Sequence, residues 1–102
     1  MVNFYGVPFS YRDRHQRLLM TFGFLFAGTA ETAVGRLRKH VGLQGWCFVE
    51  VVDEVQHIEL ARWDAIRHRD WAEYLGRLPS ASVLADPSQQ LAIHLLPAIE
   101  LT

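Results

Sequence analysis

Three aromatic side chains and one imidazole between positions 63 and 74 are the strongest candidates for chemistry in this sequence. Trp71 and Tyr74 are three positions apart, so they are neighbours on a helix surface, and His68 lies three positions before Trp71. Together with Trp63, they could line an aromatic pocket in which an imidazole and a phenol exchange a proton with a planar phenolic ligand. The simpler interpretation is that the aromatic residues pack a helix onto a sheet and leave His68 in solvent.

A second group of polar residues precedes this aromatic stripe. His57, Glu59 and Trp63 alternate and would share one face of a strand, where Glu59 could orient His57 as a base. Arg62 could hold a carboxylate or a phenolate. As structural residues, His57 and Glu59 would instead meet cross-strand partners at an exposed sheet edge, and Arg62 would pair with Glu50 or Glu59.

Other common signatures of catalysis are missing from the sequence. Cys47 is the only cysteine and lies in an apolar run without a visible activating partner, so we expect a small core residue there. His57 and Glu59 alone are a poor metal signature, so we predict no metal and no other cofactor. The sequence contains no P-loop, GxGxxG, GxSxG or HExxH motif.

The composition describes one small domain with a large apolar content. The chain has 102 residues, and half of them are hydrophobic, which is more than a monomer of this size easily buries. We therefore predict a homodimer. Ten basic and eleven acidic residues give a formal net charge of -1, so we predict no binding to nucleic acid or to a membrane. With no secretory signal pattern and no apolar run long enough to cross a bilayer, we expect a cytoplasmic protein.

The first half of the chain predicts an arm, a strand and a helix. Residues 1–16 show no sustained period and are interpreted as an extended arm beside a core of residues 17–102. Residues 17–27 are apolar on both faces, which is typical of a central strand buried on two sides. We expect this chain's helices to cover one side and a second subunit to cover the other. A helix should follow from residues 30 to 40, with Thr29 as N-cap and Gly42 after its end.

The second half predicts a hairpin, a helix and a last strand. Residues 46–52 and 55–63 are two β-rich runs separated by a polar break. Asp64 would then cap a helix that Pro79 stops, and a loop would follow. Residues 91–101 fit either a short helix or a last strand, and their alternation favours the strand. The order β-α-β-β-α-β predicts an α+β, ferredoxin-like domain with an antiparallel sheet and two helices on one face.

The hairpin and the helix after it resemble the core of dimeric α/β-barrel proteins of the antibiotic-biosynthesis-monooxygenase type. The resemblance rests on the glycine loop at residues 41–45, on Trp63-Asp64 at the end of the hairpin, and on Asp70-Trp71 and Tyr74-Leu75 in the helix. It covers residues 18–80 and implies a homodimer with a pocket between helices and sheet. The haem-degrading branch has an Asn in its first strand, and the predicted first strand of this chain, residues 17–27, has none. That branch also has a His in the region where this chain has Glu73 and Tyr74, so the resemblance does not extend to haem.

Two functions follow from these observations. The first is a cofactor-independent oxygenase, cyclase or isomerase that acts on an aromatic or polyketide-like small molecule. Its proton-transfer residue would be His68 or His57. Its substrate-binding residues would be Trp63, Trp71, Tyr74 and Arg62. The alternative is a non-catalytic homodimer that binds a small molecule or a protein through the same sheet face, and a face closed by packing would favour it.

Overall fold

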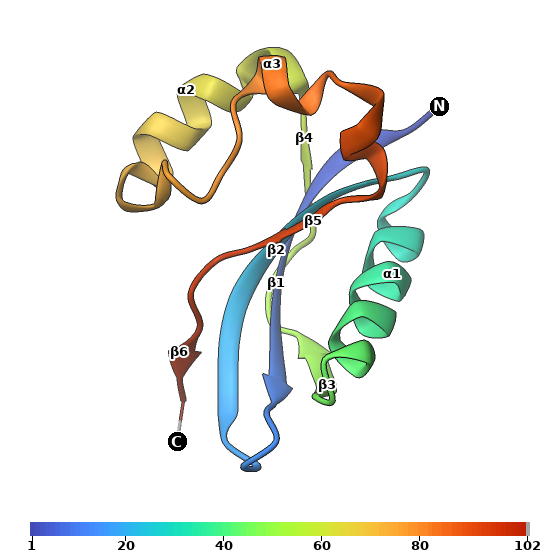
Figure 1. The fold of residues 1–102 in the computed structure, drawn as a ribbon, viewed down its shortest axis with the longest axis vertical. Coiled ribbons are helices and arrows are strands. Elements are labelled where there is room, and N and C mark those ends of the chain that lie inside the picture. Colours follow the sequence, from blue (N-terminus) through green and yellow to red (C-terminus); the bar gives the residue numbers. More distant parts are fainter. Residues whose placement is uncertain (102) are drawn as a thin grey trace.

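The structure is a computed structural model that describes residues 1–101. The α+β class is confirmed, with one antiparallel sheet (Figure 1). The strands are β1 (Asn3–Arg12), β2 (Leu18–Ala27), β3 (Cys47–Val51), β4 (Gln56–Ile58), β5 (Ile93–Leu95) and β6 (Ile99–Glu100). The helices are α1 (Ala30–Leu43), α2 (Leu60–Asp70) and α3 (Ala81–Leu84), with short 3-10 turns at η1 (Ala72–Tyr74) and η2 (Pro87–Leu91). The prediction of two helices on one face was wrong, because α1 packs on one face of the sheet while α2 and α3 pack on the other.

The hairpin of β1 and β2 forms the middle of the sheet. The two strands are in register from Asn3 opposite Ala27 to Arg12 opposite Leu18. β3 pairs with one end of β1 and β4 with the other end, so β3 and β4 follow one another along a single edge. β5 and β6 follow one another along the outer edge of β2 in the same way. The six segments therefore build a sheet that is four strands wide.

The prediction of an extended arm over residues 1–16 was wrong, because β1 is a central strand of the sheet. Small residues on one face of β1 pair with large residues of β2, such as Gly6 with Phe24 and Pro8 with Phe22. A Cβ atom at Gly6 would lie 3.0 Å from Cε1 of Phe24, so the large ring needs the small partner. This pairing of small with large hides the usual alternation of a strand.

The predicted hairpin of residues 46–52 and 55–63 was also wrong. β3 and β4 both pair with β1 and run in the same direction, so the break between them is an irregularity in one edge. α2 begins at Leu60, four residues before the expected cap, and Asp64 lies inside it. The order along the chain is therefore β-β-α-β-β-α, followed by short elements, and differs from the predicted β-α-β-β-α-β.

Helix α1 confirms the predicted helix that begins at residue 30 with Thr29 as its N-cap. The Oγ1 atom of Thr29 accepts a hydrogen bond from the backbone N–H of Thr32, which makes Thr29 the N-cap. Three apolar residues, Ala33, Leu37 and Val41, are completely buried against the sheet. The helix ends three residues later than expected. Gly45, and not Gly42, takes the left-handed backbone conformation, with φ of 79°.

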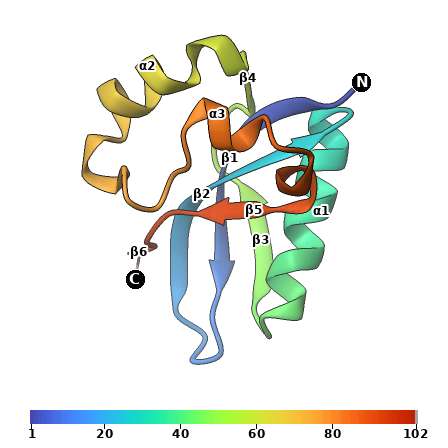
Figure 2. The same cartoon turned by 45° about the horizontal axis from the view of Figure 1, so that its top comes forward.

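Each face of the sheet has its own core. α1 packs on the face formed by Tyr5, Val7, Phe9, Tyr11 and Leu25. The opposite face carries Phe4, Phe24 and Phe26, which pack against Ile58, Trp63, Leu78, Leu84 and Leu96. This chain's own α2 and α3 therefore cover the upper part of the second face, where a partner had been expected (Figures 1 and 2).

Asp13 organises the turn between β1 and β2. Its Oδ1 atom accepts hydrogen bonds from the backbone N–H groups of His15 and Arg17 at 2.9 and 3.0 Å. Its Oδ2 atom accepts a hydrogen bond of 2.7 Å from Nε of Arg17. Gln16 follows with φ of 62°, the left-handed residue that completes a three-residue hairpin loop. The carboxylate thus holds together the turn that joins the two central strands.

The contribution of Asp13 to stability is expected to depend on pH. Burial alone would raise the pKa of Asp13, but hydrogen bonds from Arg17 and His15 lower it below the ordinary 3.8. A lowered folded-state pKa stabilises the fold above 3.8, and this stabilisation is lost as the pH falls through the lower, folded-state pKa. Asp13→Asn should therefore lower the melting temperature at neutral pH and much less in strong acid. Asp53→Asn, at an exposed position, is the control, and an equal effect of Asp13→Asn at both pH values would contradict this account.

Candidate interaction surface

Trp63, which the sequence suggested as a pocket residue, lies in the core under α2. Its side chain is completely buried, and its Nε1 atom donates a hydrogen bond of 2.8 Å to the carbonyl oxygen of Pro79. Its ring packs against Phe4 and Phe24, with centroid distances of 5.2 and 5.1 Å. In this arrangement the indole supports the sheet and is not exposed to a ligand.

Trp71 and Tyr74 do come together, in a small apolar cleft. α2 ends at Asp70, so Trp71 caps its C-terminus and Tyr74 ends η1. The Trp71 ring meets Phe22 of β2 edge to face, with centroids 4.7 Å apart. The cleft has a volume of about 120 Å³ and is also lined by Met20, Phe22, Leu96 and Ile99. This space accommodates one side chain of a partner better than a polycyclic ligand.

The other predicted site residues lie elsewhere. His68 is exposed on α2, outside the group of residues that lines the cleft. His57 is exposed on β4, and its ring packs on Tyr5 with centroids 5.5 Å apart. Arg62 pairs with Glu59 at 3.5 Å, as the structural interpretation predicted, but both side chains are mostly exposed, so this pair adds little stability. The structure therefore does not bring the two histidines and the aromatic residues to one site.

Below α2 and α3, the sheet face opposite α1 has no helix over it in the part of the chain that the structure describes (Figures 1 and 2). We call this surface the open sheet end. Strand register places the following residues on it: Pro8, Ser10, Arg12, Leu18, Met20, Cys47, Glu50 and Ile99. Pro8 and Ser10 are buried between larger neighbours, while Cys47 and Ile99 are exposed and Leu18 and Met20 are half-buried. The expectation that Cys47 is a core residue was wrong, because its face of β3 is uncovered.

Two opposite charges flank the apolar residues of the open sheet end. Arg12 lies beside Cys47 on the neighbouring strand, and Glu50 lies beside Ser10. Within residues 1–101, neither Arg12 nor Glu50 takes part in an ion pair. The surface thus combines an apolar centre with one positive and one negative group. Such an arrangement is suited to recognition of another protein surface.

Comparisons with protein-family models, with curated proteins and with solved structures found no match to this chain. The resemblance to dimeric α/β-barrel proteins therefore stays a prediction. None of the helices in residues 1–101 is both long and apolar enough to cross a membrane.

Proposed function

We propose that this chain is a non-catalytic binding module that forms a homodimer through the open sheet end. The observation that supports the proposal is a sheet face covered by α2 and α3 at one end and bare at the other, where Leu18, Met20 and Ile99 meet solvent. A second copy of the chain would remove these apolar side chains from water. The composition, with half of the residues hydrophobic, points the same way.

The charges on this surface are suited to a two-fold arrangement. In a symmetric dimer, each contact occurs twice, because the same patch faces its own copy. Arg12 of one protomer can then face Glu50 of its partner, and Glu50 can face Arg12 of the partner. The two charges, unpaired within residues 1–101, would thereby neutralise each other across the interface.

The open sheet end is small for a protein–protein interface. Four strands about 4.8 Å apart and about five residues per strand give a projected face of roughly 300 Å². Standard interfaces bury about 800 Å² per partner, so the dimer should be weak and reversible. The cleft beside Met20 and Ile99 can extend the contact by receiving one partner side chain.

An oxygenase, cyclase or isomerase is the alternative function. Its predicted pocket residues Trp71 and Tyr74 line a cleft of about 120 Å³. Pockets for small molecules usually enclose about 300 Å³ or more. The size of the cleft and the burial of Trp63 therefore support binding between proteins more than turnover of a polyketide-like substrate.

Charge reversal tests the proposed dimer. Arg12→Glu and Glu50→Arg should each abolish dimers in analytical ultracentrifugation, because each variant places like charges opposite one another twice. An equimolar mixture of the two variants should recover dimers, since both contacts in the mixed pair join opposite charges. Circular dichroism of each variant checks that it is folded.

Lys39→Glu, which reverses an exposed charge on α1 at the opposite face of the sheet, is the matched control and should dimerise like the wild type. A wild-type chain that remains monomeric at high micromolar concentration would contradict the proposal. A mixture of the two charge variants that stays monomeric would contradict the assigned contact.

A further inference from the structure

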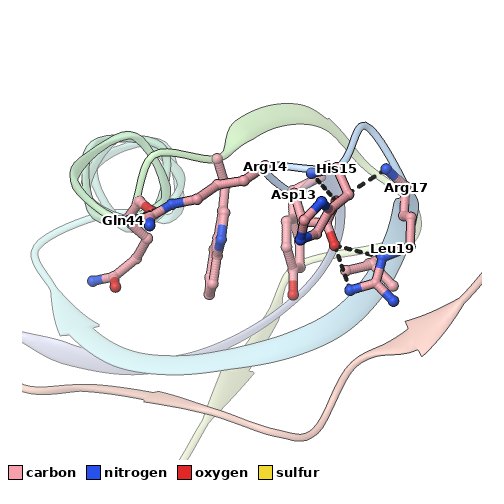
Figure 3. A pocket seen from close by; sticks show the side chains of 8 residues that line it. Asp13, Arg14, His15, Arg17, Leu19 and Gln44 are labelled. Carbon is pink, nitrogen blue, oxygen red and sulfur yellow. Dashed lines mark hydrogen bonds and ion pairs between the residues drawn. The ribbon is translucent and has the colours of Figure 1, made fainter.

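A second surface feature lies at the tip of the β1–β2 hairpin, on the α1 side of the sheet. It is an open groove of about 430 Å³, which we call the hairpin groove (Figure 3). Its walls come from the hairpin turn, from the end of α1 and from the start of β3. The residues that the argument uses are Tyr11, Asp13, Arg14, Arg17, Gln44 and Trp46.

Two guanidinium groups are held in place at the groove. Nε and Nη2 of Arg14 both donate hydrogen bonds to the carbonyl oxygen of Gln44, at 3.2 and 3.0 Å. On the other side, Nε and Nη2 of Arg17 contact Asp13, each at 2.7 Å. Figure 3 shows Arg14 reaching toward Gln44 and Arg17 joined to Asp13. Within residues 1–101, Nη1 of neither arginine donates a hydrogen bond, so both keep a donor for a ligand.

The glycine after α1 allows this position of Arg14. A Cβ atom on Gly45 would lie 3.0 Å from Nε of Arg14, so a larger residue would displace the guanidinium. The left-handed backbone of Gly45 also turns the chain from α1 toward β3. The guanidinium group of Arg14 is therefore already positioned in the free protein, so binding costs little side-chain entropy at this residue.

The charge balance of the groove favours an anion. Among the described residues that line the groove, Asp13 is the only one with a carboxylate, and both of its oxygens already accept hydrogen bonds from the turn and from Arg17. Glu100, which pairs with Leu19, adds a negative charge near Arg17 but not beside Arg14. Arg14 offsets the partial negative charge at the C-terminus of α1, and His15 adds an imidazole at the rim. Guanidinium donors that are held by one edge can take up a carboxylate or phosphate with the other.

The groove also has an aromatic wall. The rings of Tyr11 and Trp46 are stacked, with centroids 4.7 Å apart and planes 24° from parallel. Trp46 is half-buried and lines the groove, so part of its indole remains available for contact with a ligand. Flat aromatic surfaces favour flat ligands.

We propose that the hairpin groove binds a small aromatic compound that carries a carboxylate or a phosphate group. The anionic group contacts Arg14, the ring of the ligand packs against Trp46, and Arg17 adds a second positive charge on the other side of the groove. The inference rests on the proposed binding role, but not on the dimer, because one chain supplies the whole groove. Loss of self-association and loss of ligand binding are therefore separate outcomes.

Calorimetric titration with phenyl phosphate, benzoate, inorganic phosphate and benzyl alcohol tests the proposal. Phenyl phosphate or benzoate should bind more tightly than both inorganic phosphate and benzyl alcohol, and added salt should weaken binding. Whichever of the two binds more tightly identifies the anionic group. Arg14→Gln should weaken binding of the aromatic anion by about tenfold or more, the scale of a charge-assisted hydrogen bond.

Arg77→Gln is the matched control, because it removes an exposed guanidinium outside the groove. Trp46→Leu should weaken phenyl phosphate but leave inorganic phosphate unchanged, which separates ring contact from charge. Absence of binding by every probe at millimolar concentration, or equal effects of Arg14→Gln and Arg77→Gln in folded proteins, would overturn the inference.

Discussion

Replacing Trp63 with alanine is expected to lower the free energy of unfolding by about 3–5 kcal/mol, the usual cost of removing a large aromatic side chain from a core. Trp63 is completely buried and packs on Phe4 and Phe24 from the two central strands. The cavity would lie between α2 and the sheet, where α2 contributes no other fully buried side chain. Chemical denaturation followed by circular dichroism measures the loss.

A matched variant separates packing from hydrogen bonding at this position. Trp63→Phe keeps a ring but leaves the carbonyl oxygen of Pro79 without its donor, so we expect a smaller loss of about 1–3 kcal/mol. Had Trp63 been a ligand contact, as the sequence suggested, alanine would impair binding and leave stability unchanged. A loss below about 1 kcal/mol for Trp63→Ala would contradict the core position of the indole.

Replacing Gly23 with alanine should destabilise the fold by about 1–3 kcal/mol, the range of overpacked cores. A Cβ atom at Gly23 would lie 2.6 Å from Cδ2 of Leu37 and 3.2 Å from Cδ2 of Leu95. Leu37 is completely buried in the middle of α1, so its side chain has little room to move. The added methyl group would therefore push α1 away from the sheet.

The control for this variant is Gly35→Ala. Gly35 lies inside α1, and a Cβ atom there would have no neighbour within 4 Å in the described structure. Because alanine favours a helix over glycine by about 1 kcal/mol, Gly35→Ala should stabilise the protein. Thermal unfolding of both variants gives the comparison, and a neutral Gly23→Ala would mean that α1 tolerates displacement from β2.

The elements predicted most accurately are those with a clear signal in their own local sequence. α1 has a side-chain cap at Thr29 and an apolar stripe, and β2 has apolar residues on both faces, so both were found close to their actual bounds. β1 was missed because Gly6 and Pro8 interrupt its pattern, and their partners on β2 are not visible from local sequence. Residues 60–63 were assigned to a strand, although packing of Trp63 in the core requires them in α2.

The candidate sites depend on contacts that local sequence does not reveal. Trp71 and Tyr74 were correctly expected to lie together, because three-residue spacing brings side chains close in most helical turns. The hairpin groove was not predicted, although residues 12–17 contain three arginines and one histidine. These residues form the turn between β1 and β2. The pairing of the two strands brings this turn beside Trp46, and local sequence does not indicate that pairing.

The position of β1 in the sheet has a consequence for synthesis on the ribosome. β1 and β2 are made first, but the outer neighbours of β1, which are β3 and β4, are complete only at residues 51 and 58, and those of β2, which are β5 and β6, only at residues 95 and 100. Until then, the early hairpin presents unpaired N–H and C=O groups along both of its sides, which other chains can recognise. Nascent chains that stop before β4 are therefore expected to aggregate, and the full chain should gain its solubility only late in translation.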